Sequence, residues 1–307
     1  MKIYLNKINE DWVVDQFVKE WNNFKPDITT YDIKDSDIIW LIAPWTWTNV
    51  NTKMLKKKMV FCTVHHIDFK KFNKKEEKNF YKRDKFVDCY HAISEKTQQQ
   101  LEKLTDKKII VAPFWLNQNN FFHIKDSTSL KKKYGFRNED FLIGSYQRDT
   151  EGADLVSPKL SKGPDRFLEI VLFYNRTIKN MTVVLTGRRR NYLINKFEEF
   201  NINYKYFEMV DYKELNELYN ILDLYIVSSR VEGGPRAVFE CAITKTPIIS
   251  TDVGYSSKIL HTQSIFDMKN FEAAKPSVDF AYNNVIQYTL PLGMDRFENI
   301  FTKIYEN

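Results

Sequence analysis

The sequence predicts two doubly wound α/β domains, and three observations support this fold class. Short apolar or β-branched runs alternate with helical patterns along most of the 307 residues, as they do in parallel sheets covered by helices. A polar, Asn-rich stretch at 113–129 interrupts the alternation. The chain also exceeds the roughly 250–300 residues that one hydrophobic core supports. We therefore expect domains at 1–118 and 119–290, and a C-terminal helix at 291–307 that can cross back to the first domain.

The expected elements follow from these runs in chain order. The strands are 28–33, 38–42, 59–63, 87–92 and 109–111, and then 141–146, 181–186, 204–207, 224–227 and 247–250. The helices between them are 12–24, 94–105, 165–175, 212–221 and 236–244. Ser94 suits a helix N-cap because its hydroxyl can accept an N–H of the first turn. Ligands bind beyond the carboxyl ends of strands in such sheets, so loops of both domains are expected to line a cleft.

Composition and charge exclude several classes of protein. No apolar stretch approaches the roughly 20 residues that span a bilayer, and no signal-peptide core follows Met1. Three cysteines without metal or disulfide spacing favour a reducing cytoplasm. The net charge of +6 lies entirely in residues 1–125, with 22 basic and 16 acidic residues, whereas residues 126–307 hold 24 of each. All six tryptophans also lie in the first part, so the two halves are expected to have different partners.

The segment 228–240 carries the strongest pattern for chemistry. It begins directly after the expected buried strand 224–227. Gly233 and Gly234 allow the backbone to approach a ligand closely, and Pro235 suits the first position of a helix. The amides at that helix start favour an anion.

Glu232 and Glu240 flank this anion site. A carboxylate can accept two hydroxyl hydrogens at once. The pair therefore suits a phosphate that lies between polyhydroxyl groups. The alternative is an ordinary strand-to-helix turn with solvated acids.

The spacing of these two acids resembles the acid-seven-acid signature of the family-four retaining glycosyltransferases, a part of the glycosyl transferases group 1. Further stretches resemble the family in the same order: 111–113 with Phe121, 143–148, 162–163, 183–187 and 247–254. The resemblance covers most of residues 87–255. It implies the GT-B fold, in which two facing Rossmann-like domains enclose a cleft.

The resemblance also implies roles for particular residues. The second domain would bind a nucleotide-sugar and the first an acceptor. Glu240 would hold the ribose, and Glu232 would contact hydroxyls of the transferred sugar. Arg148 and Lys162 would contact the diphosphate, where fixed cations stabilise the charge that grows as it departs. Backbone around the helix start would complete the donor site, through Gly233, Gly234, Pro235, Arg236 and Ala237.

Candidates in the first domain lie after two expected strands. His65 stands where the family often has a catalytic His near the donor sugar, and His66 stands where an Asp usually follows. The implied front-face mechanism needs no nucleophilic carboxylate. Trp45 and Trp47 follow the strand 38–42 and are expected at the cleft rim, where their rings could stack on an acceptor sugar or rest at a membrane interface.

Residues 53–85 hold 12 basic and four acidic residues. This charge could attract anionic lipid or a polyprenyl-phosphate acceptor, and the alternative is a solvated surface. No module for nucleic acid accompanies it. Asp35-Ser36-Asp37 matches a metal-binding Asp-x-Asp, but its place before a strand favours a turn. We expect no metal and no cofactor other than the nucleotide-sugar co-substrate.

The sequence therefore predicts a retaining, metal-independent glycosyltransferase that acts in polysaccharide, lipopolysaccharide or glycolipid assembly. It would lie in the cytoplasm or peripherally at the inner face of the membrane. The alternatives are a sugar-nucleotide epimerase or hydrolase on the same fold, and a non-catalytic nucleotide-sugar-binding subunit.

Overall fold

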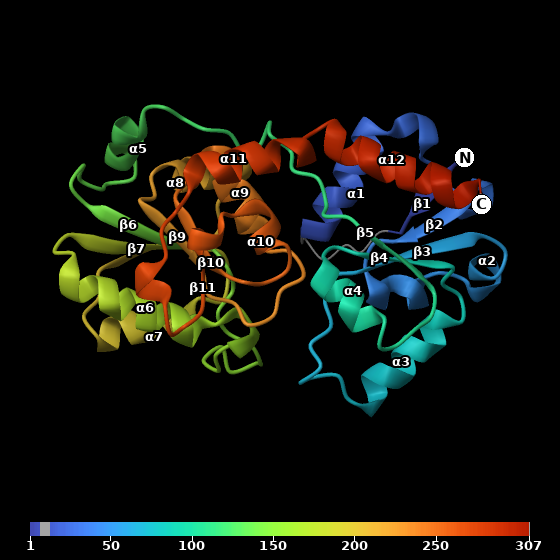
Figure 1. Cartoon of the computed structure of the whole chain (residues 1–307), viewed down its shortest axis with the longest axis horizontal. Helices are drawn as coiled ribbons and strands as arrows, with labels where there is room; N and C mark the ends of the chain where they lie inside the picture. Colours follow the sequence, from blue (N-terminus) through green and yellow to red (C-terminus); the bar gives the residue numbers. More distant parts are fainter. Residues whose placement is uncertain (7–12, 307) are drawn as a thin grey trace. The chain divides into compact units, whose positions relative to one another are not determined.

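The computed structural model describes residues 1–6 and 13–306, and the chain divides into two compact units (Figure 1). Unit 1 comprises Met1–Trp115 and Pro291–Asn307, and unit 2 comprises Leu116–Leu290. The first break thus lies within the stretch 113–129, and the C-terminal residues belong to unit 1. Trp12, the first residue of an expected helix, lies outside the described residues.

Unit 1 is built on a five-stranded parallel sheet with the strand order β1-β2-β3-β4-β5. The strands are β1 (Ile3–Leu5), β2 (Ile38–Leu41), β3 (Met59–Val64), β4 (Cys89–Ala92) and β5 (Lys108–Val111). The helices are α1 (Val13–Phe24), α2 (Thr52–Leu55), α3 (Lys74–Asp84), α4 (Glu95–Leu101) and α12 (Leu292–Tyr305). As expected, Ser94 caps α4, because its Oγ accepts the Thr97 N–H at 3.2 Å.

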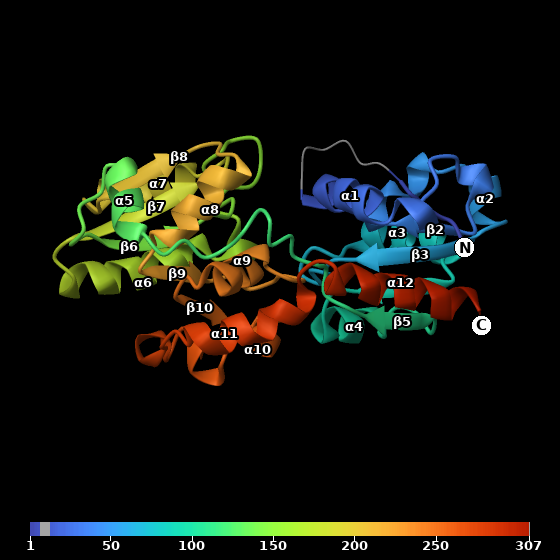
Figure 2. The same ribbon diagram turned by 90° about the horizontal axis from the view of Figure 1, so that it is seen from above.

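Helices α1 and α12 pack on one face of this sheet (Figure 1, Figure 2). Aromatic residues fill that face. The Trp21 ring of α1 lies 5.4 Å from that of Trp40 in β2, and Trp40 lies 5.0 Å from Phe301 of α12. Trp21, Trp40 and Trp115 are fully buried. Three of the six tryptophans are therefore buried in the core of unit 1 and are not available to a binding partner. Apolar side chains of α2, α3 and α4 cover the other face.

The expected strand at 28–33 is wrong. Two 3-10 turns, Pro26–Ile28 and Ile33–Asp35, occupy most of it, and only Thr29 forms a parallel bridge, to Ile3 of β1. Pro fixes the backbone of the first turn. In the second turn, Asp32 accepts the Lys34 N–H at 2.9 Å, so local turn chemistry outweighs the β-branched residues. The Asp35 motif thus belongs to a turn, and no group of three or more His, Cys, Asp and Glu that could hold a metal occurs in the described residues.

Unit 2 holds a six-stranded parallel sheet with the order β11-β10-β9-β6-β7-β8. The strands are β6 (Phe141–Ser145), β7 (Met181–Thr186), β8 (Tyr204–Phe207), β9 (Leu224–Val227), β10 (Ile248–Thr251) and β11 (Ile265–Phe266). The helices are α5 (Ser127–Lys133), α6 (Pro164–Thr177), α7 (Asn191–Glu199), α8 (Tyr212–Asn220), α9 (Arg236–Thr244), α10 (Ser256–Ile259) and α11 (Val278–Val285). Helices α6 and α7 cover one face, and α8, α9 and α11 cover the other. The chain begins in the middle of the sheet at β6, moves outward to β8, and then crosses to β9, so its winding reverses between β6 and β9.

The part of the chain that the structure describes contains no helix long and apolar enough to cross a membrane.

Candidate functional site

The reversal of winding in unit 2 brings the carboxyl ends of β6 and β9 side by side. The two strands pair through Gly144 and Tyr225. Ligands of doubly wound sheets bind at such a switch point, beyond the strand ends. The segment after β6 carries Arg148 and Lys162, and the loop after β9 carries Glu232. The fold therefore gathers three of the candidate residues at one edge of one sheet.

The two loops interlock at Gly163. This residue has φ +65°, and a Cβ there would lie 2.0 Å from the Ser228 carbonyl oxygen. The Ser228 Oγ donates to the Gly163 carbonyl at 2.8 Å, and the Arg230 N–H donates to the Ser161 carbonyl at 2.8 Å. Only glycine fits this combination of positive φ and close approach. Lys162, the preceding residue, is thereby held against the β9 loop.

Lys162 and Glu232 form an ion pair at this junction. The Lys162 Nζ donates to Glu232 Oε1, and the Ser229 Oγ donates to the same oxygen at 3.2 Å. The Glu232 side chain is 9% exposed and that of Lys162 is 24% exposed. A cation and a carboxylate are thus fixed in contact with each other, and both are partly open to a ligand.

Glu240 lies farther along α9, as the sequence predicted. Its Oε2 accepts the Tyr219 hydroxyl at 2.7 Å, and its Oε1 lies 3.7 Å from Arg236 Nε. The side chain is 12% exposed. Burial raises the pKa of Glu240, while Arg236 and the Tyr219 hydroxyl oppose that rise. Tyr219 and Arg236 orient the carboxylate, and its oxygens can still accept further hydrogen bonds from a ligand.

The start of α9 differs in detail from the expectation. Pro235 is the N-cap rather than the first helical residue, and no side chain caps the helix from that position. Gly234 is required by packing inside the protein, because a Cβ there would lie 2.0 Å from Cε1 of Tyr255. The Tyr255 ring in turn lies 4.5 Å from that of Phe239 in α9. Gly234 therefore leaves room for the Tyr255 ring at the start of α9. From the sequence alone, this glycine is predicted to leave room for a ligand.

Arg148 stands apart from the ion pair. Its side chain is exposed and forms no hydrogen bond or ion pair with residues 1–6 or 13–306. Partial burial and the charge of Arg189 lower its pKa, and Glu151 opposes them. The structure thus brings Lys162 and Glu232 together, but it does not bring Arg148 into contact with either.

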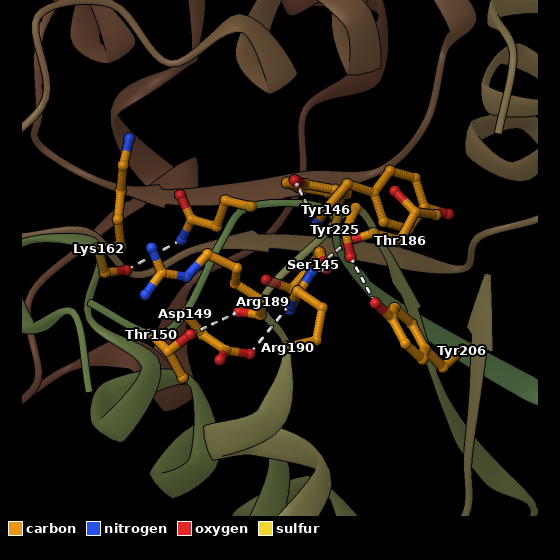
Figure 3. A network of polar contacts seen from close by, with 12 residues as sticks. Ser145, Tyr146, Asp149, Thr150, Lys162, Thr186, Arg189, Arg190, Tyr206 and Tyr225 are labelled. Atoms are coloured by element: carbon orange, nitrogen blue, oxygen red, sulfur yellow. Dashed lines mark hydrogen bonds and ion pairs between the residues drawn. The ribbon is translucent and has the colours of Figure 1, made fainter. Parts of the chain in front are cut away.

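A buried ion pair that sequence reasoning missed anchors the segment next to Arg148 (Figure 3). Arg190 Nε donates to Asp149 Oδ2 at 3.0 Å, and both side chains are almost fully buried. The guanidinium also donates to the Ser145 carbonyl at 2.5 Å and to the Thr186 carbonyl at 2.8 Å. Burial raises the pKa of the Asp149 carboxyl, and Arg190 opposes that rise. The pair ties the ends of β6 and β7 to the residue that follows Arg148. The available signal was the run of three arginines at 188–190, directly after the β7 residues and Gly187.

In unit 1, Trp45, Trp47 and His66 line one pocket of about 480 Å³. Trp45 is 44% exposed. His65 lies beside this pocket, with its ring 6.3 Å from that of Trp45 and its Nε2 3.0 Å from the Ile42 carbonyl oxygen. Burial lowers the pKa of His65 to about 4. The imidazole is therefore neutral at pH 7 and can donate from Nε2 to Ile42.

Comparisons with known proteins identify the family and the fold. A family model described as "Glycosyl transferases group 1" matches residues 128–286, about half of the chain. No curated protein matches the sequence. Several solved structures share the fold over nearly the whole chain. HepE from Anabaena, in complex with UDP, has a TM-score of 0.73 at 12% identity and covers 98% of this chain and 100% of its own.

Sucrose-phosphate synthase from Thermosynechococcus elongatus has a TM-score of 0.71 at 12% identity, and the match covers 98% of this chain and 81% of that one. A glycosyltransferase from Rickettsia africae has a TM-score of 0.64 at 16% identity, with 98% and 84% covered. At these identities the likeness concerns the fold. The expected GT-B fold, with two parallel-sheet α/β domains, is confirmed.

Proposed function

The chain belongs to the family of glycosyl transferases group 1, and from this membership we propose that it moves a sugar from a UDP-sugar to a glycan or lipid-linked acceptor. The transfer proceeds with retention and without a metal ion. The placement of Lys162, Glu232 and Glu240 around one switch point carries the proposal. The UDP and UDP-glucose complexes of HepE support uridine as the nucleotide.

Each candidate residue has a chemical task in this proposal. Glu240 accepts the ribose hydroxyls, and Glu232 accepts hydroxyls of the transferred sugar. The backbone of 233–237 contacts the sugar or the phosphates at the start of α9. Lys162 and the exposed Arg148 balance the diphosphate. Since Lys162 also neutralises Glu232, the carboxylate can lie close to the diphosphate without repelling it.

The reaction uses one face of the sugar. The acceptor oxygen forms a bond to the anomeric carbon on the side from which UDP departs. The bond from that carbon to the phosphate oxygen breaks, and its electron pair stays on the phosphate. The acceptor proton passes to the departing phosphate oxygen. Lys162 stabilises the growing negative charge, and such electrostatic stabilisation is usually the largest single contribution to catalysis.

The acceptor belongs to polysaccharide, lipopolysaccharide or glycolipid assembly in this proposal, with the protein in the cytoplasm or at the inner face of the membrane. The cysteines support a reducing compartment, because Cys62, Cys89 and Cys241 are all buried and unpaired.

A panel of UDP-sugars tests the function. The protein is incubated with each sugar, with and without candidate acceptors, and in the presence of EDTA. We expect UDP release that depends on the acceptor and persists in EDTA, and a product with the donor's anomeric configuration. An isomerised nucleotide-sugar indicates an epimerase, release without an acceptor indicates a hydrolase, and tight binding without turnover indicates a binding subunit.

Glu240→Gln is expected to weaken UDP binding by roughly ten- to hundred-fold, because a charge-assisted hydrogen bond contributes about 1.5–3 kcal/mol. Isothermal titration calorimetry with UDP measures the change in affinity. Glu199→Gln, which removes the same charge from the exposed surface of α7, is the matched control and should bind UDP as the wild type does. Unchanged affinity in Glu240→Gln contradicts the ribose role.

A further inference from the structure

Most of the residues that line the pocket of unit 1 belong to the cationic segment 53–85. It lies among the 3-10 helix Pro44–Asn49, the segment 64–73 and one face of α3. The α3 residues that line it are Glu76, Asn79, Phe80 and Arg83, whose spacing of three, four and seven places them on a single helix face. Its volume of about 480 Å³ falls in the range of small-molecule sites.

The lining combines aromatic faces with hydrogen-bonding groups. Trp45, Trp47 and Phe72 supply rings. Carboxylates and amides are among the polar groups, and they come from Asp68, Asn73, Glu76 and Asn79. Rings pack against the C–H faces of a sugar, while carboxylates and amides bond its hydroxyls. This mixture suits a sugar ring better than an apolar ligand.

Arg83 is the unusual member of the lining. The residue is 8% exposed, and its Nε has no hydrogen-bond partner. Its guanidinium donates to the Pro44 carbonyl at 3.3 Å and lies over the Phe80 ring at 5.0 Å. It also contacts Tyr90, whose hydroxyl donates to Asp84 Oδ1 at 3.0 Å. No carboxylate forms an ion pair with it within residues 1–6 and 13–306. A buried charge without a directly paired carboxylate is costly. The buried Arg190 of unit 2, by contrast, has Asp149.

Asp84 is linked to Arg83 through the Tyr90 hydroxyl but forms no ion pair with it, and the charges that line the pocket do not pair with it either. Glu76 is exposed to solvent, and Asp68 Oδ1 accepts the Lys70 N–H at 3.1 Å. Lys71 adds a second positive charge to the lining. An anion that enters with a ligand is therefore the group that would complete the hydrogen bonding of Arg83.

We propose that this pocket binds the acceptor through a sugar ring that carries an anionic group, with Arg83 as the residue that selects the anion. The proposal rests on the transfer reaction above and names the chemical class of its acceptor. The shared chemistry is a negatively charged substituent on a sugar, either a carboxylate or a phosphate ester. The guanidinium holds such a group through paired N–H donors.

Tryptophan fluorescence tests the proposal without a donor, because Trp45 and Trp47 line the pocket. The protein is titrated with glucose, glucuronate and glucose 6-phosphate, and Trp45→Phe identifies the origin of the signal. We expect at least one charged sugar to bind roughly ten-fold or more tightly than glucose, because hydrogen bonds to charged groups are the strong ones. If glucuronate binds more tightly than glucose 6-phosphate, the recognised group is a carboxylate. If glucose 6-phosphate binds more tightly, it is a phosphate ester.

Arg83→Met should abolish this preference, and Arg83→Lys should retain part of it. Lys82→Met removes a positive charge from the adjacent, exposed position of α3 and should keep the full preference. Removal of an uncompensated buried charge should also leave the urea midpoint unchanged or higher. Equal binding of glucose and both charged sugars to the wild type overturns the proposal, whether or not Arg83→Met folds. So does a preference that survives in Arg83→Met.

The experiments distinguish a failure of the anion selectivity from a failure of the proposed transfer reaction. If UDP-sugars neither bind nor turn over while the charged sugar binds, the transfer reaction fails and the pocket stands as a sugar site. If UDP release proceeds only with neutral acceptors, the transfer reaction stands and the anion selectivity fails.

Discussion

Lys162→Met is expected to lower the turnover of a UDP-sugar by roughly a hundred- to a thousand-fold, the usual effect of removing one group that stabilises a departing anion. Its Nζ contacts Glu232 at the switch point of unit 2. The variant loses the cation and leaves a carboxylate that is 9% exposed without its partner. UDP affinity should therefore fall as well, because the unpaired Glu232 repels the diphosphate. Steady-state kinetics and UDP titration measure the two effects.

Lys196→Met serves as the matched control. This lysine pairs with Glu199 on the surface of α7 in the same unit, and its loss should change neither quantity. Wild-type turnover in Lys162→Met would remove the residue from the mechanism.

Glu232→Gln is expected to lower turnover without lowering UDP affinity, whereas Lys162→Met lowers both. Turnover is expected to fall by roughly a hundred-fold or more, since the carboxylate holds sugar hydroxyls in the transition state. UDP affinity should stay equal or rise, because Lys162 no longer shares its charge with a carboxylate. A loss of UDP affinity comparable to that of Glu240→Gln contradicts this assignment.

The double variant Lys162→Met with Glu232→Gln adds a check on the pair. Residues in contact have effects that do not add. UDP affinity should be higher in the double variant than in Lys162→Met alone, because the unpaired carboxylate is gone. Additive losses would mean that the two residues act independently.

Much of the fold follows from the sequence because the buried strands have a strong pattern. The runs at 181–186, 204–207 and 224–227 match β7, β8 and β9 to the residue. The failures have local causes. At 28–33, Pro26 and Asp32 form turns, and helix α3 has few apolar residues to show a period. Phe121, in the stretch expected as a linker, is buried in the core of unit 2.

The candidate site shows a similar limit. The spacing of Glu232 and Glu240 is local and can be seen in the sequence. The contact of Lys162 with Glu232 depends on Gly163 and Ser228, whose loops meet only in the folded sheet. The Arg190–Asp149 pair joins residues 41 positions apart, and nothing local specifies such a partner.

The return of the chain to unit 1 through α12 has a consequence for synthesis. Unit 2 is one continuous segment, whereas the aromatic core of unit 1 lacks Phe297 and Phe301 until the ribosome has passed residue 301. Domains generally fold as they emerge, the N-terminal one first. Here the part that emerges first must wait with Trp21 and Trp40 incompletely covered, so the nascent chain closes its second unit before its first. During that interval, the exposed indole rings are the surface that a chaperone would shield.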